Sequence, residues 1–205
     1  MALICETSGW WSLVQVVQEA AAVARQVTLF QRTPCIALPL IQRKLDADAA
    51  RKLKEGQLKV FDHRKKTFGG HSYSFTERGI SDFSPEERKE LYEQLFARGG
   101  FLPLLCGFRE VYTDDDANDW VYAFWRNKVR ARINNPWLQE KLAPTVKPYP
   151  YAARRPLLEQ NYYDVFNQSN VCLIDVNENG ISRLPRKGFR RRTALNTASM
   201  LSPAA

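Results

Sequence analysis

The chain has 205 residues, of which 44% are hydrophobic and 25% charged, a balance that is typical of a folded globular protein and excludes an intrinsically disordered one. Its 30 Lys and Arg residues outnumber 22 Asp and Glu residues, so the formal charge of +8 favours an anionic partner such as a phosphorylated ligand or a nucleic acid. No apolar run approaches the roughly 20 residues of a membrane span, and the start of the chain lacks the basic residues of a secretory signal, so we expect a cytoplasmic protein without a membrane span.

The beginning of the chain shows the pattern strand, helix, strand. A short apolar run at 3–5 is followed by a turn-like patch at 7–12, and from Leu13 the apolar positions recur with the spacing of one buried helical face. A β-rich run at 26–30 predicts a second strand, which ends before Pro34 because proline lacks a backbone donor. A strand, a helix of about 13 residues and a second strand form the first unit of a dinucleotide-binding fold.

The middle of the chain is helical and rich in charge. Ser84, followed by a proline and then by Glu87, has the pattern of a capping box, and a glycine pair ends that helix. Aspartates at 114–116 begin another helix, where they favour the positive end of the helix dipole. The sequence predicts helices at 46–54, 85–98, 114–132 and 136–142.

After these helices the pattern changes again. An extended connector at 149–151 leads to a short helix at 157–166, then to the clearest strand of the chain at 170–176 and a shorter strand at 181–184. We expect the strand at 170–176 to join the sheet of the first two strands. The fold class is therefore predicted as α/β: an incomplete Rossmann-like dinucleotide-binding domain with a mostly helical insertion.

This interpretation divides the chain into four parts. They are the first βαβ part of the nucleotide-binding domain at 1–43, the helical insertion at 44–145, the return to the nucleotide-binding domain at 146–190, and an unstructured tail at 191–205. The basic run at 186–192 suits nucleic-acid binding or a targeting signal, but an unstructured end explains it as well.

Two candidate nucleotide-binding residues lie at the ends of the first elements. Gly9 stands in the turn between the first strand and the helix, where a glycine lets the backbone approach a pyrophosphate; a purely structural turn explains it equally well. Arg32 follows the second strand about 20 residues after this turn, where a guanidinium suits the 2′-phosphate of NADP and Thr33 adds a hydroxyl donor. A solvated arginine at the end of a strand is the alternative.

The pair Arg154 and Arg155 is a further candidate. Adjacent side chains of an extended segment point in roughly opposite directions, so one arginine can reach a phosphate while its neighbour faces a different anion. A solvated basic patch before a helix explains the pair as well. His63 and His71 are the only histidines and no cysteines form a CxxC pair, so we expect no metal site and no catalytic triad.

Several segments of the chain carry a family resemblance. They are VQVVQE at 14–19, VTLFQRTP at 27–34, RKKTFGG at 64–70, SPEER at 84–88, FWR at 124–126, VRARI at 129–133, RPLLEQNYY at 155–163, FN at 166–167 and NVCLIDV at 170–176. Together they resemble the NADPH-binding domain of flavin-dependent Baeyer–Villiger monooxygenases. The segment FQRTP at 30–34 and the RP…YY…FN run carry the resemblance jointly, and neither decides it alone.

The resemblance implies a class B flavoprotein monooxygenase. Such enzymes use FAD, NADP(H) and O2 to insert one oxygen beside the carbonyl of a small-molecule ketone, and the resemblance implies no metal and no nucleic acid as partners. Arg155 falls on the family's catalytic arginine, whose cation keeps the flavin peroxide anionic by electrostatic preorganisation.

The resemblance also assigns cofactor-binding residues. By motif position, Arg32 and Thr33 hold the adenosine 2′-phosphate of NADP(H), and Arg154 helps them. Ser12 and Gln15 fall in the turn that binds the pyrophosphate.

The chain departs from the family pattern in two respects. The family's glycine-rich turn has glycines where this chain has Ser8, Trp10 and Leu13. The FAD-binding GxGxxG unit and the FxGxxxHxxxWP fingerprint, which precede this region in the family, are absent from the sequence. We therefore expect a fragment of the monooxygenase that is inactive alone because it lacks the FAD domain. The alternative is a non-enzymatic basic module that binds an anionic partner such as nucleic acid.

Overall fold

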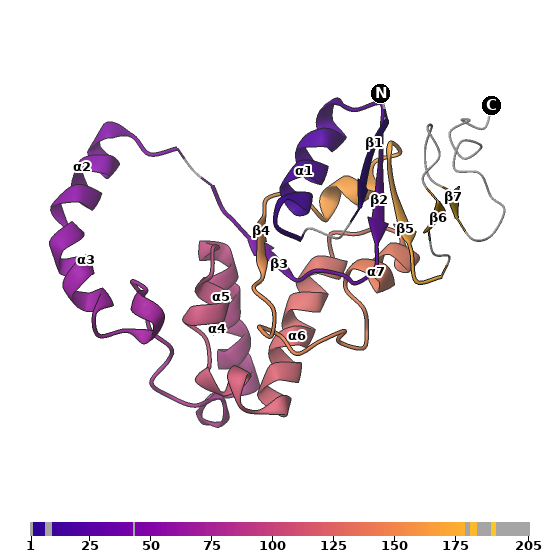
Figure 1. The fold of residues 1–205 in the computed structure, drawn as a ribbon. Helices are drawn as coiled ribbons and strands as arrows, with labels where there is room; N and C mark the ends of the chain where they lie inside the picture. The colour runs from indigo at the N-terminus through magenta and orange to yellow at the C-terminus, as the bar shows by residue number, and fades with distance from the viewer. Residues whose placement is uncertain (1, 7–9, 43, 179–180, 184–189, 192–205) are drawn as a thin grey trace.

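A three-stranded parallel sheet forms one end of the structure (Figure 1). The computed structural model describes residues 2–6, 10–42, 44–178, 181–183 and 190–191. The strands β1 (Ala2–Glu6), β2 (Gln26–Gln31) and β5 (Val171–Asp175) lie in the order β1-β2-β5, so β2 pairs with a strand on each side. This pairing confirms that the strand predicted at 170–176 joins the two strands at the start of the chain.

Helix α1 (Trp10–Val23) connects β1 to β2 and packs against the sheet. Val14, Val17 and Ala21 recur at helical spacing on its buried face, in one cluster with Leu29 of β2. The predicted strand–helix–strand unit is therefore confirmed. The helix begins at Trp10, however, so residues 10–12, predicted as part of a turn, form its first turn.

A second, shorter parallel ladder lies between the sheet and the helices. Strand β3 (Ala37–Pro39) pairs with β4 (Leu157–Glu159), and backbone bonds from Leu157 to Ile36 (3.0 Å) and from Leu40 to Glu159 (2.7 Å) extend the pairing. The helix predicted at 157–166 is therefore wrong: a strand comes first, and the 3-10 helix η4 (Asp164–Asn167) follows later. Leu157 and Glu159 are buried while the residue between them is half-buried, which is the alternation of a strand.

The middle of the chain is helical, as predicted. The helices are α2 (Ala47–Glu55), α3 (Gln57–Arg64), α4 (Pro85–Arg98), α5 (Leu102–Leu105), α6 (Asp115–Arg130) and α7 (Pro136–Leu142), with the 3-10 helices η1 (Phe68–Gly70), η2 (Ile80–Asp82) and η3 (Arg109–Tyr112). The capping box of α4 is confirmed: the Glu87 N–H donates to Ser84 Oγ (3.2 Å), and the Ser84 N–H donates to the Glu87 carboxylate (2.7 Å). Gly99 ends this helix with a φ of 73°.

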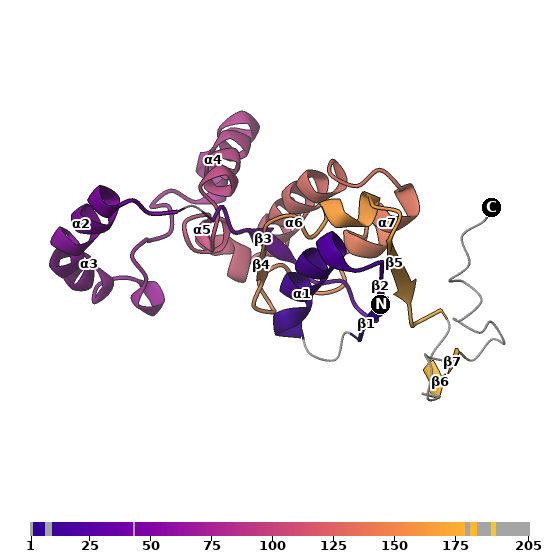
Figure 2. The same ribbon diagram turned by 90° about the horizontal axis from the view of Figure 1, so that it is seen from above.

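Helices α2 and α3 project away from the rest of the molecule (Figures 1 and 2). Gly56 separates them, so the helix predicted at 46–54 is followed by a second one that the sequence analysis missed. All residues of the two helices are described, and none of them is buried. Their stability therefore rests on local hydrogen bonds, among them the bond from the Ala49 N–H to the Asp46 carboxylate (2.7 Å).

Two buried polar side chains of α6 join the helical part to other segments. The indole Nε1 of Trp125 donates to the backbone oxygen of Ala37 in β3 over 2.9 Å. The side-chain amide of Asn118 donates to the backbone oxygens of Val111 (2.8 Å) and Tyr151 (2.9 Å), and its oxygen accepts from the Tyr151 N–H (2.9 Å). Trp120 and Phe124 of α6 also form an aromatic cluster with Tyr92, Phe96 and Phe108.

The last described residues form a small antiparallel pair. Strand β6 (Ile181–Arg183) confirms the strand predicted at 181–184 over its first three residues and pairs with β7 (Arg190–Arg191), whereas Leu184 lies outside the described residues. Arg191, predicted to open an unstructured tail, is therefore in a strand. The remainder of that tail, 192–205, lies outside the described residues.

Two features that bear on function are absent from the described part of the chain. No helix there is long and apolar enough to cross a membrane. No group of three or more His, Cys, Asp and Glu side chains is placed there to hold a metal ion.

Candidate functional site

The carboxyl ends of the parallel strands meet at one edge of the sheet (Figure 1). At this edge β1 ends at Glu6, β2 at Gln31 and β5 at Asp175. Helix α1 begins soon after β1, so its unpaired amide groups and the positive end of its dipole belong to the same edge. Arg32 and Thr33 follow β2 directly, so both candidates lie at the edge where parallel α/β sheets bind ligands.

The backbone that carries Arg32 is held by the neighbouring strand. The Val176 N–H donates to the Gln31 oxygen over 2.9 Å, and the side-chain amide of Asn177 donates to the Arg32 oxygen. The Arg32 side chain is exposed, and Thr33 is half-buried beside it. A fixed backbone therefore presents an exposed guanidinium at the end of β2.

A tyrosine brings Arg154 to the segment that follows Arg32. The Tyr149 hydroxyl donates to the Pro34 oxygen (3.1 Å) and accepts from the Ile36 N–H (3.1 Å), while the Arg154 guanidinium lies 4.6 Å from the centroid of the Tyr149 ring. Burial raises the pKa of Tyr149 to about 12, so the phenol keeps its proton at neutral pH and continues to donate to Pro34. The structure thereby gathers two of the predicted arginines around one short segment.

Arg155 contacts a different ring from its neighbour. Its guanidinium lies 5.6 Å from the centroid of Phe101, the residue before α5, so it faces the helical part of the chain. The two arginines therefore contact different segments, as the sequence analysis expected of neighbouring side chains. The predicted extended connector before them bends, because Tyr151 and Ala152 form a turn in which Ala152 has a φ of 70°.

The remaining predicted residues lie in or before α1. Gly9 lies outside the described residues, and Ser12 is described only as part of the first turn of α1. Gln15 is exposed on that helix. Their roles beside a pyrophosphate stay predictions, as do the nucleotide contacts of Arg32 and Thr33.

A charged network at the same edge escaped the sequence analysis. Lys141 Nζ of α7 donates to Asp175 (2.7 Å) and to Glu178 (2.7 Å), and the Gln31 side chain donates to the backbone oxygen of Lys141 (2.7 Å). Hydrogen bonds to the two carboxylates raise the pKa of Lys141. Burial opposes the ionisation of Asp175, but hydrogen bonds from Lys141 and Asn177 prevail and lower its pKa. One indication of this network was present in the sequence: Asp175 is a charged residue at the end of the otherwise apolar strand β5.

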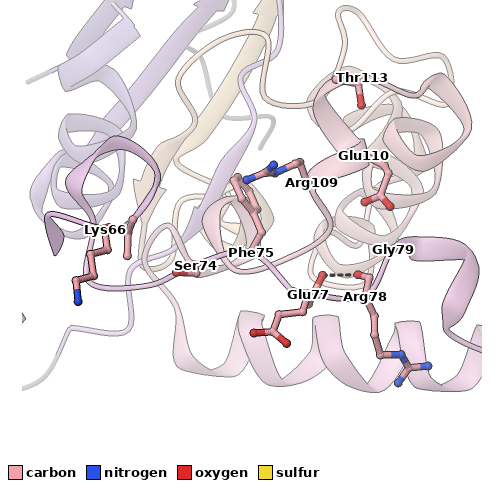
Figure 3. Close-up of a pocket in the computed structure, with 11 residues that line it drawn as sticks. Lys66, Ser74, Phe75, Glu77, Arg78, Gly79, Arg109, Glu110 and Thr113 are labelled. Atoms are coloured by element: carbon pink, nitrogen blue, oxygen red, sulfur yellow. Dashed lines mark hydrogen bonds between the residues drawn. The ribbon is translucent and has the colours of Figure 1, made fainter. Parts of the chain in front are cut away.

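A separate cavity of about 610 Å³ lies in the helical part of the chain (Figure 3). Arg109 and Glu110 line it from one side, and the loop that carries Phe75 and Arg78 lines it from the other. The Arg109 guanidinium lies 5.7 Å from the centroid of the Phe75 ring. Because cations and carboxylates line the cavity together, its charge selects no class of ligand.

Comparisons with known proteins agree on one class of enzyme, although no protein-family model matches the chain. The chain is 49% identical over 176 residues to cyclopentanone 1,2-monooxygenase of Comamonas sp.. This alignment covers 86% of the chain and 32% of the relative. It is 34% identical over 177 residues to the FAD-binding monooxygenase acrE of Aspergillus aculeatus, covering 86% of this chain and 30% of that protein. The chain thus spans about a third of the length of the relatives it matches.

Solved structures give the same result for the fold. A crystal structure of the monooxygenase OTEMO in complex with FAD and NADP matches with a TM-score of 0.90 at 29% identity. The match covers 95% of this chain and 36% of that one. The mixture of helices and short parallel strands is therefore a known arrangement within a larger protein.

Proposed function

This chain belongs to the family of FAD-binding Baeyer–Villiger monooxygenases, with which it aligns along 86% of its length. From this membership we propose that the chain supplies the NADP(H)-binding part of such an enzyme. The position of Arg32 carries the proposal. Its exposed guanidinium follows the central strand of a parallel sheet, at the edge where α1 also begins. An arginine at this place suits the 2′-phosphate that distinguishes NADP from NAD.

The proposal interprets the sheet and α1 as part of a Rossmann-like dinucleotide-binding domain. The parallel pairing of β1 with β2, and of β2 with β5, supports this interpretation, as does the helix that connects the first two strands. In such a domain the pyrophosphate lies at the N-terminus of the first helix. Ser12 in the first turn of α1, Gly9 before it and Gln15 after it are the residues we assign to this part of the nucleotide.

The residues around Arg32 fit a phosphate. A guanidinium offers a planar fork of donors that matches phosphate oxygens, and Thr33 adds a hydroxyl beside it. Arg154 adds a second cation, because Tyr149 holds it next to the segment that follows Thr33. We propose that these three side chains hold the adenosine 2′-phosphate.

The complete reaction belongs to a longer protein than this chain. Bound NADP(H) supplies a hydride, and we assign FAD binding to the two thirds of the relatives that lie outside this segment. Arg155, which faces the helical part over Phe101, is proposed to provide a fixed cation where negative charge develops during oxygen insertion beside a ketone. Without the FAD-binding portion we expect no oxygenation by this chain.

The test is a titration of the purified chain with NADP+ and with NAD+. Arg32→Ala should weaken NADP+ binding about 10- to 100-fold, the range of hydrogen bonds to a charged group, and leave NAD+ binding unchanged. Arg51→Ala is the control, because Arg51 is an exposed arginine of α2 paired with Asp48 (2.7 Å). Equal affinity of the wild-type chain for both nucleotides would contradict the proposal, as would an Arg32→Ala variant that binds NADP+ like the wild type.

A second measurement tests the assignment of FAD. The purified chain should be colourless and should not oxidise NADPH in the presence of a cyclic ketone. A yellow protein that carries flavin would show that the chain binds FAD without the rest of the relatives' length.

A further inference from the structure

Helix α7 of the helical part reaches back to the edge of the sheet where Arg32 lies. Lys141 Nζ lies 2.7 Å from a carboxylate oxygen of Asp175, the last residue of β5, and its backbone oxygen accepts from the side chain of Gln31, the last residue of β2. Gln31 and Asp175 are register partners across the sheet. One lysine thus contacts both strands at the position immediately before Arg32.

The same network continues to the backbone of Arg32. One oxygen of Asp175 accepts from the Asn177 N–H (2.9 Å) and from the Asn177 side-chain amide (3.0 Å), and that amide also donates to the Arg32 oxygen. Lys141 holds the other oxygen of Asp175. The orientation of Asn177, and with it the anchor of Arg32, therefore depends on an aspartate that Lys141 fixes.

The positive charge of Lys141 also affects a bound phosphate, because it neutralises two nearby carboxylates. One hydrogen-bonded side chain, Asn177, separates the Asp175 carboxylate from the Arg32 backbone, and Glu178 shares Lys141 with Asp175. These carboxylates therefore lie near the residue that we assign to the phosphate, and a nearby negative charge repels an anionic ligand. Lys141 pairs with both carboxylates, and its side chain is 22% exposed, so solvent screens these interactions incompletely. Without this cation the two carboxylates would act against the 2′-phosphate.

We propose that Lys141, acting through Asp175 and Asn177, is a positioning residue that sets the preference of this site for a 2′-phosphorylated nucleotide. The proposal rests on the proposed function, since it concerns the phosphate that Arg32 is assigned to hold. It is specific in one respect: the effect falls on the 2′-phosphate and spares the rest of the adenosine nucleotide.

The experiment measures the affinity of the full chain for 2′,5′-ADP and for 5′-AMP by calorimetry. Asn177→Ala, at an exposed position, should weaken 2′,5′-ADP binding about fivefold, which is the worth of one neutral hydrogen bond. Lys141→Met should weaken it about tenfold or more, with a smaller loss at high salt, while Lys141→Arg restores most of the affinity. In every variant the affinity for 5′-AMP should stay within about twofold of the wild type.

Two further variants separate this role from general stabilisation of the fold. Lys128→Met breaks an exposed pair of 2.6 Å between Lys128 of α6 and Glu93 of α4 and should leave both affinities unchanged. On the background of Arg32→Ala, Lys141→Met should cause a smaller further loss of 2′,5′-ADP binding than it does in the wild type. The part of its effect that acts through Arg32 is then already gone, and only the repulsion by the unpaired carboxylates remains.

The outcomes distinguish the two proposals. If the wild-type chain binds both probes equally and Arg32→Ala changes nothing, the proposed function fails and this inference falls with it. If Arg32→Ala abolishes the preference but the Lys141 and Asn177 variants keep it, this inference alone is overturned. An equal loss of both probes in the Lys141 variant would also overturn it, since that result indicates a damaged scaffold.

Discussion

Arg132 follows α6 and pairs with the buried carboxylate of Glu159 in β4, so its removal tests how the helical part is attached to the β3–β4 ladder. Its guanidinium contacts both oxygens of Glu159, at 2.6 and 3.2 Å, and also pairs with Asp164. Glu159 is 1% exposed and accepts in addition from the Tyr162 N–H over 3.0 Å. Arg132→Met keeps much of the aliphatic volume and removes the charge.

The expected loss follows from the burial of Glu159. Breaking a buried ion pair by removing one partner costs about 3–5 kcal/mol, because the remaining charge is left uncompensated. Arg132 is itself 30% exposed, and Glu159 keeps its bond from Tyr162, so we expect a loss near the lower end, about 3 kcal/mol in the free energy of unfolding. The double variant Arg132→Met/Glu159→Gln removes the stranded charge and should recover a part of this loss.

The assay is urea unfolding near neutral pH, with the free energy extrapolated to water. Lys128→Met is the matched control: its pair with Glu93 has a similar length of 2.6 Å, but both side chains are more than 40% exposed, so its removal should cost less than about 1 kcal/mol. If Arg132→Met costs no more than this control, burial does not decide the strength of these ion pairs. A double variant that is less stable than Arg132→Met would equally refute the reasoning.

Three further predictions concern stability. Ser84→Ala removes the cap of α4 and should lower the free energy of unfolding by about 1 kcal/mol, measured by urea unfolding, whereas no loss would mean that the capping box is not formed in solution. Asn118→Ala leaves the backbone N–H and oxygen of Tyr151 without their partner and should cost about 3 kcal/mol by the same measurement; a loss below 1 kcal/mol would indicate that water replaces the amide. The lowered pKa of Asp175 means that its pair with Lys141 stabilises the fold above the ordinary aspartate pKa, and that this stabilisation is lost as the pH falls through the lower, folded value. In melting curves Asp175→Asn should therefore destabilise the chain near neutral pH and lose this effect as the medium is made more acidic than the ordinary aspartate pKa; an effect that grows in acid would have the wrong sign.

Elements with a strong local pattern could be predicted from the sequence. The buried face of α1 and the capping box of α4 are encoded within a few consecutive turns, and both are confirmed. The apolar run at 171–174 also sufficed to predict β5, and its place in the sheet followed from the interpretation of the helical block as an insertion between two α/β pieces. Local pattern and tertiary structure agree at these positions.

The second ladder shows where such reasoning stops. Strands β3 and β4 have three residues each, and each is a strand only because it pairs with the other. The run around Leu157 is compatible with a helix until the partner Ala37 is known, since the two come from distant parts of the chain. The prediction of a helix failed because tertiary pairing overrode local propensity.

In the candidate site, too, some residues could be predicted from local sequence and others could not. Arg32 could be predicted because its place follows from the order of nearby elements. Tyr149 and Lys141 could not, because the bond from Tyr149 to Pro34 spans 115 positions and the bond from Gln31 to Lys141 spans 110. A sequence shows which residue follows a strand, whereas the partners that hold it come from elsewhere in the fold.

The insertion of the helical part between β2 and β5 imposes an order on folding. The side chain of Asn170, beside β5, donates to the backbone oxygen of Ala24, beside β2, across 146 positions, and closing a loop of that length slows folding. During synthesis β1, α1 and β2 leave the ribosome long before their third strand. Until 171–175 arrives, one edge of β2 stays open, and that interval is when two nascent chains are most prone to pair with each other.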